Sequence, residues 1–239
     1  STSPTADNTT ICEGESTNLY TNPAGGSGSY SYSWSSSPAG FTSTDENPSV
    51  NPVTTTTYTV TVDDGYNTTT GSIVVNVNPA PTADAGADQE VCAGTSVTLT
   101  ATGGTSYSWD NGVSQGVPFT PTTTNTYTVT VQDGNGCTAT DDVVVTVNDL
   151  PIVDAGVDVS ITQGTSTTLD ASVTGGSGSF TYSWTPADSL VDATIQDPTT
   201  LNLYTTNIFT LIVTDDVTGC QNTDNVTVTV TGGPLALNL

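Results

Sequence analysis

The feature that most constrains the fold is a repeat. Three tryptophans, Trp34, Trp109 and Trp184, follow one another at intervals of 75 residues, and each closes the tripeptide Tyr-Ser-Trp. Two further runs rich in Val and Thr follow each Trp, at residues 58–62, 127–131 and 209–213 and then at 72–77, 143–147 and 226–230. Self-similarity at a fixed period identifies tandem structural units. The chain is therefore expected to be three copies of one domain.

The runs predict short strands rather than helices. They are four to seven residues long, mostly apolar at every second position, and separated by Gly, Asp, Asn and Pro. That pattern is typical of antiparallel strands with one buried face. About seven such strands per copy, with a Trp on an early strand and Tyr or Phe opening a late one, favour the immunoglobulin-like sandwich. The predicted fold class is all-β, with three tandem immunoglobulin-like domains.

The predicted domains span residues 1–79, 80–149 and 150–231, followed by a tail at 232–239. In the middle copy, strands A and B are expected within 84–101, strand C around Trp109, strand F at 127–131 and strand G at 138–147. Proline-containing links at 78–81 and 148–151 are stiffer than Gly/Ser tethers. We therefore expect a rod on the order of 100 Å long.

Aromatic positions that recur between the copies are the candidate core. The tryptophans offer the largest single burials in domains whose hydrophobic content is only 33%. Three aromatic residues that open the later strands complete this set: Tyr58, Tyr127 and Phe209.

The charge balance excludes whole classes of function. The chain has no Lys, Arg or His and 24 acidic residues, which gives a formal net charge of −24. It lacks an imidazole base, an amine for Schiff-base chemistry and a guanidinium to hold phosphate. Nucleic acid and anionic membranes are repelled, and no apolar run is long enough to span a bilayer. Carboxylate pairs can hydrolyse glycosides, but here they fall in turns of small sandwiches, so we expect no enzyme.

Several phrases resemble a known family. Residues 83–89, 94–99, 107–109 and 153–158, which include Asp-Ala-Gly-Ala-Asp and Asp-Ala-Gly-Val-Asp, resemble the opening strands of PKD-type immunoglobulin-like repeats. Cys92-Ala-Gly and Gly136-Cys137 resemble repeats in large surface proteins of gliding bacteria that use type IX secretion. The resemblance covers nearly the whole chain. It implies an extracellular location at the bacterial cell surface, in a stalk, spacer or adhesive module.

The same resemblance has a gap. The Trp is not followed by the Asp-Phe-Gly-Asp-like phrase of the best-known members, so calcium or ligand features tied to that phrase are not carried over. No initiator Met or signal peptide appears, and we expect a mature or excised segment of a secreted precursor.

Acidic pairs in the turns are candidate Ca²⁺ ligands, because Ca²⁺ takes six to eight oxygen ligands. The predicted place is the first domain junction. There the A–B turn with Glu13 and Glu15 would approach Asp84 of strand A and Asp133 of the F–G hairpin. Asp is also common in turns because it bonds the local backbone. The cofactor prediction is therefore either none or Ca²⁺.

Other surface features point to glycans. Tyr20, Tyr30, Tyr66 and Tyr204 are candidates for stacking on sugars, and Tyr66 is expected at a hairpin tip. Cross-strand packing or simple exposure is the alternative for each of them. Ser189, within Asp-Ser-Leu, matches a short pattern that resembles bacterial O-glycosylation sites.

The four cysteines occupy two repeat positions. Cys12 and Cys92 precede the Gly of the A–B turn, and Cys137 and Cys220 open strand G. In this topology the A–B turn faces the following domain and the F–G hairpin the preceding one, while a disulfide requires Cα atoms about 4.4–6.8 Å apart. We therefore predict Cys12–Cys137 and Cys92–Cys220, formed in an oxidising exterior. The competing pairing is Cys92–Cys137.

Together these features predict a non-enzymatic extracellular structural protein, a segment or subunit of a bacterial surface filament, stalk or adhesin. Its expected partners are copies of itself or other domains of a long surface protein. The alternative is an adhesive module that binds glycans or a surface. The tail at Leu235–Leu239 is an apolar alternating strand. It either completes a neighbouring subunit's sheet or begins a further domain.

Overall fold

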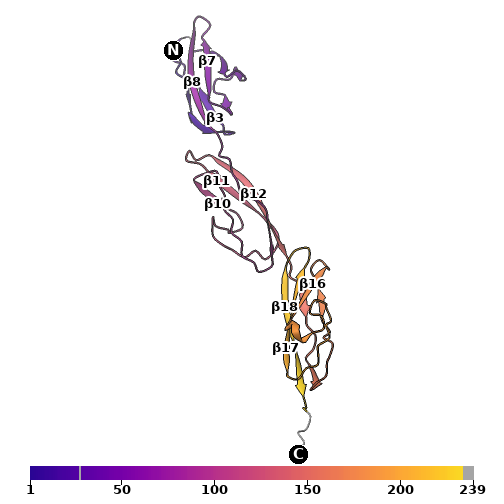
Figure 1. The fold of residues 1–239 in the computed structure, drawn as a ribbon. Helices are drawn as coiled ribbons and strands as arrows, with labels where there is room; N and C mark the ends of the chain where they lie inside the picture. The colour runs from indigo at the N-terminus through magenta and orange to yellow at the C-terminus, as the bar shows by residue number, and fades with distance from the viewer. Residues whose placement is uncertain (27, 234–239) are drawn as a thin grey trace, which may run out of the picture. The chain divides into compact units, whose positions relative to one another are not determined.

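The computed structural model describes residues 1–26 and 28–233 (Figure 1). In these residues the chain forms strands β1 to β18 and one 3-10 turn, η1 (Ala187–Ser189), so the fold is all-β as predicted. No helix in this described part is long and apolar enough to cross a membrane.

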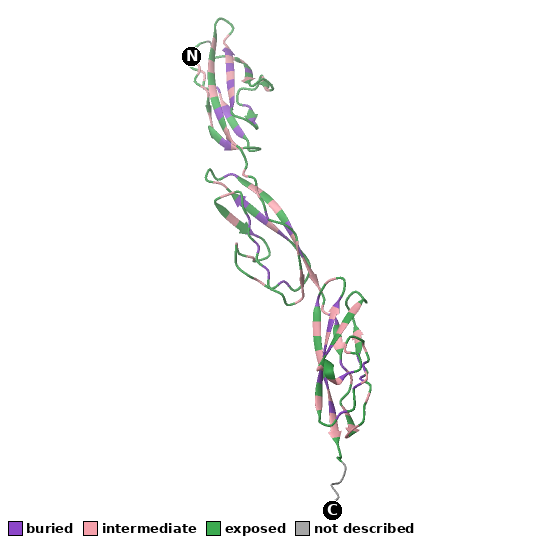
Figure 2. Ribbon diagram, in the orientation of Figure 1, coloured by how far each residue is buried: buried purple, intermediate pink, exposed green. Residues whose placement is uncertain are grey.

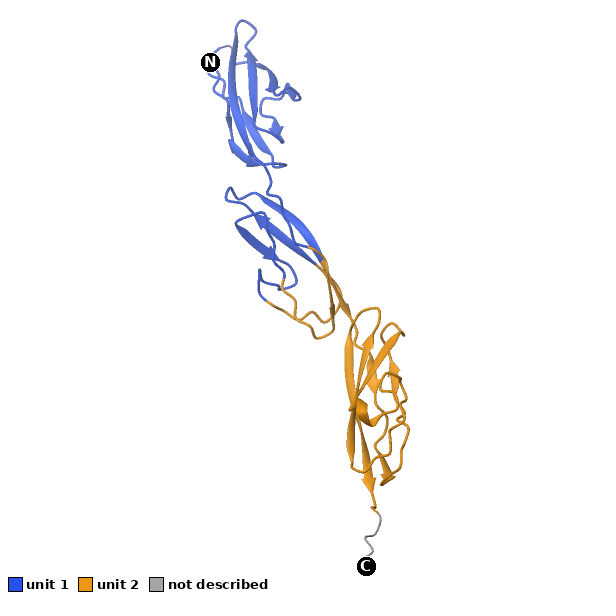
Figure 3. Cartoon of the chain, in the orientation of Figure 1, with its two compact units in different colours: residues 1–86, 99–117, 127–143 blue, residues 87–98, 118–126, 144–239 orange. Residues whose placement is uncertain are grey.

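The chain divides into two compact units (Figure 3). One contains residues 1–86, 99–117 and 127–143, and the other residues 87–98, 118–126 and 144–239. The middle repeat contributes residues to both units. The domain boundaries drawn from the sequence, after residues 79 and 149, therefore stay a prediction.

The N-terminal repeat, in the first unit, consists of two sheets. The larger has the order β2 (Thr10–Cys12), β8 (Thr68–Asn78), β7 (Thr56–Asp63), β4 (Ser31–Ser37) and β5 (Thr42–Ser43). The smaller has the order β1 (Thr5–Ala6), β3 (Thr17–Tyr20) and β6 (Ser49–Val50). β1 pairs antiparallel with β3, whereas β2 pairs parallel with the last strand, β8. The opening strand thus serves both sheets in turn.

The same strand order recurs twice. In the middle repeat it is β9 (Gln89–Cys92), β12 (Thr138–Asn148), β11 (Asn125–Gln132) and β10 (Ser106–Trp109). In the third repeat it is β14 (Val159–Thr162), β18 (Gln221–Thr231), β17 (Asn207–Asp215) and β16 (Phe180–Thr185). The first strand again runs parallel to the last in both. Three copies of this order make the chain a tandem array of immunoglobulin-like sandwiches.

The second sheet is less regular in the later repeats. In the third it consists of β13 (Ile152–Asp154) and β15 (Ser172–Thr174). In the middle repeat only the isolated bridges Asp84–Thr102 and Val97–Phe119 represent it. Of the two strands expected within 84–101, β9 (Gln89–Cys92) forms a ladder, and the bridge at Val97 represents the second. Short runs with few cross-strand hydrogen bonds do not extend into a ladder.

The core lies between the sheets and consists of alternate residues of the long strands, which are buried (Figure 2). All six aromatic core residues predicted from the repeat are buried. They are Trp34, Tyr58, Trp109, Tyr127, Trp184 and Phe209. β7 shows the cause, because buried and half-buried residues alternate strictly along it from Thr56 to Asp63.

The Asp-Ala-Gly phrases hold the opening strand where it changes sheets. In the first unit, Asp84 Oδ1 accepts the N–H of Gly86 at 2.9 Å, and Asp141 Oδ2 accepts the N–H of Ala85 at 2.8 Å. In the second unit, Asp154 and Asp224 repeat both bonds at the same distances, on the N–H groups of residues 156 and 155. These carboxylates supply acceptors to backbone that belongs to no ladder.

A glycine is required in this phrase. Gly156 has φ +92°, and a Cβ built on it would lie 2.5 Å from the carbonyl oxygen of Asp170. An L side chain would be strained there by both its backbone angle and the contact.

Candidate functional site

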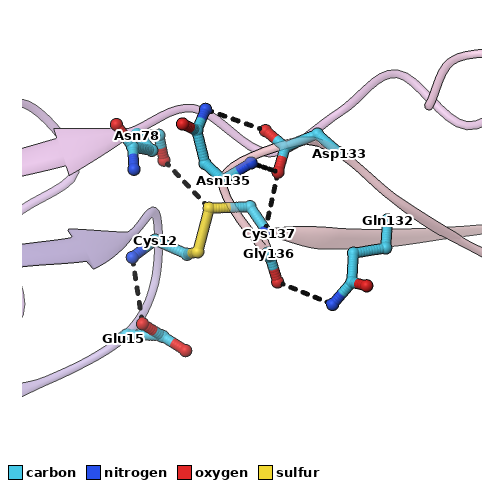
Figure 4. Close-up of a disulfide and its surroundings, with 8 residues drawn as sticks. All are labelled: Cys12, Glu15, Asn78, Gln132, Asp133, Asn135, Gly136 and Cys137. Carbon is cyan, nitrogen blue, oxygen red and sulfur yellow. Dashed lines mark hydrogen bonds between the residues drawn. A yellow bond between two sulfur atoms is a disulfide. The ribbon is translucent and has the colours of Figure 1, made fainter. Parts of the chain in front are cut away.

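Cys12 and Cys137 form a disulfide within the first unit, with Cα atoms 5.5 Å apart (Figure 4). Cys12 ends β2, where it is the register partner of Asn78, the last residue of β8. Cys137 follows the turn between β11 and β12, and its sulfur lies 4.0 Å from the carbonyl oxygen of Asn78. Only 1% of Cys137 is exposed. The bond is therefore shielded from solvent on that side, beside the point where the chain leaves the N-terminal repeat.

Cys92 and Cys220 form the equivalent bond within the second unit, with Cα atoms 5.6 Å apart. Cys92 ends β9 opposite Asn148, the last residue of β12. Cys220 follows the turn between β17 and β18 and is completely buried. These two bonds are the pairs predicted from the sequence. The competing Cys92–Cys137 pair does not form, and the described residues contain no free cysteine.

Each of these hairpins is built around one aspartate. Asp133 Oδ1 accepts the N–H groups of Asn135 and Cys137, both at 2.9 Å (Figure 4). Asp64 Oδ1 accepts two N–H groups of the β7–β8 turn, from Tyr66 at 3.0 Å and Asn67 at 2.7 Å. Asp133 thus stabilises the turn that precedes Cys137, and Asp64 stabilises the equivalent turn of the N-terminal repeat, which has no cysteine.

The third member of this set, Asp215, is completely buried. Its carboxylate accepts N–H groups from Ser177 at 2.5 Å, Val217 at 2.9 Å and Thr218 at 3.1 Å. A buried carboxylate without a cation is costly unless hydrogen bonds compensate it. Because the chain has no Lys, Arg or His, backbone N–H groups take that role here.

The pKa values reflect this arrangement. The N–H of Ser177 lowers the pKa of the Asp215 carboxyl well below its usual range, against an opposing effect of desolvation and with further help from Thr218. Desolvation raises the pKa of Asp133, but hydrogen bonds from Cys137 and Asn135 outweigh it, so that pKa is also lowered. Both groups therefore remain ionised, and their hairpins held, at neutral pH.

The four predicted calcium ligands do not form a ligand set. Glu15 accepts the N–H of Cys12 at 2.9 Å, while Asp133 and Asp84 are bonded to their own turns. Glu13 is exposed. Among the described residues, no group of three or more acidic, cysteine or histidine side chains is placed to hold a metal ion. Three of the four carboxylates thus accept backbone N–H groups, and Ca²⁺ binding stays a prediction.

The tyrosines proposed for sugar stacking fall into two classes. Tyr20 donates to Asp7 at 2.9 Å and Tyr30 to the carbonyl of Gly25 at 2.5 Å. Tyr66 and Tyr204 are 88% and 65% exposed, and Tyr66 lies on the β7–β8 turn as predicted. The structure therefore leaves two large aromatic rings open to solvent.

Two further predictions concern the third repeat. Ser189 ends η1 and is half-buried, and its carbonyl accepts the N–H of Leu201 at 2.8 Å. Leu235–Leu239 lie outside the described residues, so both predictions for that segment stand.

Sequence reasoning missed some residues that stabilise the site and the core. Asp215 is one, although its position at the end of β17 matches that of Asp133 directly after β11 and could have revealed it. Gln115 is another: its Oε1 accepts Trp109 Nε1 at 2.8 Å, and its Nε2 donates to the carbonyl of Ala101 at 2.8 Å. It lies in an irregular loop, and no repeated phrase marks it.

Comparisons with known proteins find solved structures of low similarity. No family model matches the chain, and no curated protein matches it. Among solved structures, the titin I-band fragment I67–I69 covers 97% of this chain and 99% of its own at 13% identity, with a TM-score of 0.42. The three N-terminal domains of the bacteriophage RB49 outer capsid protein Hoc cover 97% and 99% at 16% identity, with a TM-score of 0.43. The insect immune protein hemolin covers 96% and 76% at 14% identity, with a TM-score of 0.36.

Proposed function

We propose that this chain is a non-enzymatic, load-bearing segment or subunit of an extracellular bacterial filament, stalk or adhesin. The observation that carries the proposal is the pair of shielded disulfides, each joining the end of one repeat to the F–G hairpin of the next. The peptide link and the disulfide then form two covalent connections at each junction. A spacer under tension benefits from this arrangement, whereas a catalyst has no use for it.

The two bonds also overlap along the chain, because Cys92 lies between Cys12 and Cys137. The shortest covalent path from one end to the other follows residues 1–12, 92–137 and 220–239. At about 3.5 Å per extended residue, this path reaches roughly 270 Å, against roughly 830 Å for the unbridged chain. Even complete unfolding would therefore expose only about a third of the available length.

Other features support an extracellular setting. Disulfides persist in oxidising compartments, and a chain without Lys or Arg offers no site to trypsin-like proteases. The bacterial cell surface as the specific location rests on the resemblance to PKD-type repeats of gliding bacteria.

Single-molecule pulling tests the mechanical proposal. The oxidised protein should reach a contour length of roughly 270 Å, and a variant that lacks one disulfide roughly 400 Å. Cys12→Ser with Cys137→Ser and Cys92→Ser with Cys220→Ser serve as matched variants, since each removes one bond. With both bonds removed the length should reach roughly 830 Å. If the oxidised protein extends as far as the fully reduced one, the disulfides bear no load and the proposal fails.

Electron microscopy of native cell-surface material, with antibody labelling of this chain, tests its setting. Label along filaments or stalks supports the structural function. Label found only inside cells contradicts it.

A second candidate function is recognition of glycans or of a surface. The observation that favours it is the exposure of Tyr66 and Tyr204, since aromatic rings of this kind can stack on sugars. A glycan array probed with the wild type and with a Tyr66→Ala, Tyr204→Ala variant tests it. Binding by the wild type that the variant loses would support an adhesive module.

A further inference from the structure

A hollow of about 330 Å³ opens on the N-terminal repeat. It lies between the glycine-rich loop that precedes β4 and the β7–β8 hairpin. Its lining includes residues from both segments: Pro23, Ala24, Gly26, Tyr30, Asp64 and Asn67.

This surface matches one that the third repeat also has. A Cβ built on Gly26 would lie 2.5 Å from Asp64 Oδ2, and a Cβ on Gly176 would lie 2.5 Å from Asp215 Oδ2. Asp64 donates its N–H to the carbonyl of Asn67, as Asp215 does to that of Cys220. The glycine-rich loop therefore packs against the hairpin in the same way in both repeats. Asn67 occupies the position in the N-terminal repeat that Cys220 occupies in the third.

In the third repeat this surface faces the end of the middle repeat. Within the second unit, a hollow of about 330 Å³ has Val147, Asn148 and Asp149 on one side, at the end of β12. The loop and hairpin of the third repeat lie on the other side, through Gly176, Ser177 and Thr218. Cys220 is completely buried at this junction, whereas Asn67 is exposed. The N-terminal repeat thus presents the receiving half of a junction with nothing described upon it.

The third repeat presents the complementary half. Thr162 is the register partner of Thr231, and Gln163 donates its N–H to the carbonyl of Thr231 at 3.2 Å. In the middle repeat, Cys92 pairs with Asn148, and the next N–H donates to the carbonyl of Asn148 at 2.8 Å. Thr162 therefore stands where Cys92 stands, and it is exposed.

Charge does not oppose contact between the two halves. The receiving hairpin is acidic through Asp63 and Asp64, whereas residues 162–164 and 231–233 contain no charged side chain. In a chain of net charge −24, such a neutral end is the surface that an acidic hairpin can approach with least repulsion.

We infer that the hollow at Gly26, Asp64 and Asn67 binds the C-terminal end of a second copy of this chain, at Thr162–Gly164 and Thr231–Gly233. The inference rests on the proposed structural function and names its partner. The contact repeats the internal junction without its disulfide, because Asn67 and Thr162 replace the two cysteines. It is heterologous, so each copy that binds leaves a free half of the contact for the next copy.

Engineered cysteines test the contact. Asn67→Cys and Thr162→Cys place thiols at the two positions that carry the disulfides elsewhere, and the native cysteines are already paired and shielded. The two single variants, one with a size tag, are mixed in 1 M NaCl, where the Debye length is about 3 Å, and then oxidised. We expect one predominant product, the mixed disulfide between residues 67 and 162, identified by peptide mapping with an Asp- or Glu-specific protease. A double variant should form a ladder of multimers.

Thr70→Cys is the matched control for Asn67→Cys, since Thr70 is also exposed and lies on the same hairpin. It should yield at least tenfold less mixed product with Thr162→Cys. Homodimers and mixed dimers in random proportion, equal yield with the control, or no cross-linking would each overturn the inference. Label on native filaments without cross-linking would sink this contact alone. Label found only inside cells, together with cross-linking, would sink the proposed function instead.

Discussion

Replacing Asp141 with alanine tests whether carboxylates substitute for missing backbone pairing in this fold. The Asp141 carboxylate accepts the N–H of Ala85 at 2.8 Å, and Ala85 is only 3% exposed. In Asp141→Ala this N–H loses its partner inside the protein. An unsatisfied buried donor costs about 1–3 kcal/mol. For a repeat of this size that corresponds to a fall in Tm of about 5–15 °C.

The neighbouring Asp142 provides the control, because it is exposed and its removal changes the net charge by the same amount. Asp142→Ala should leave Tm unchanged or raise it slightly, since it relieves self-repulsion in an acidic chain. Asp141→Asn keeps an acceptor oxygen but loses the charge, so about half of the destabilisation is expected. Thermal and guanidinium unfolding measure the differences, and hydrogen exchange reports directly on the Ala85 amide. Equal Tm values for the two alanine variants, with an Ala85 amide that stays protected in both, would refute the reasoning.

Three further predictions follow from the same structure. The pKa of Asp215 is lowered in the folded state, so its stabilisation is complete above about pH 4, the unfolded value, and declines as the pH falls below it. The Tm of Asp215→Asn should therefore fall less than that of the wild type between pH 4 and 2, and an Asp216→Asn variant that behaves the same way would contradict this. Trp34→Ala should lower the stability of its repeat by about 3–5 kcal/mol, whereas Tyr66→Ala should change it by less than about 0.5 kcal/mol; equal effects in chemical denaturation would mean that the core is misassigned. Raising NaCl from 10 mM to 1 M should raise Tm, because repulsion among like charges is screened and no side-chain salt bridge exists to be weakened; a Tm that falls with salt would count against this account.

Much of the fold was readable from the sequence because it repeats. One copy of a short alternating run is ambiguous, but three copies in register identify strands, turns and core positions together. Trp34, Trp109 and Trp184 are buried as expected, since alternation along a strand decides which face a side chain takes. The strand order also explains the cysteines. A first strand that runs parallel to the last brings Cys12 to the end of β8, beside the chain's exit from the repeat.

The hydrogen-bond partners of the carboxylates could not be predicted from the sequence. Composition alone established that no side-chain cation pairs with them, and Ca²⁺ was a predicted partner for four of them. The structure instead directs Glu15, Asp84 and Asp133 to N–H groups of their own turns. Which N–H group a carboxylate accepts depends on which backbone donors in the loops lack a partner in a sheet. Local sequence does not predict those positions.

The sequence by itself therefore determined the fold class, the repeat, the aromatic core and the absence of cationic chemistry, because each follows from residue type and period. Tertiary structure decided what depends on the meeting of distant segments. It buried Asp215 among N–H groups of a loop and a turn, and it left Asn67 exposed at the position where Cys137 and Cys220 are covered. Asp215 accepts the N–H of Ser177, which is 38 positions away, and Cys137 is covered beside Cys12 and Asn78. Local sequence does not specify which distant segments meet at these positions.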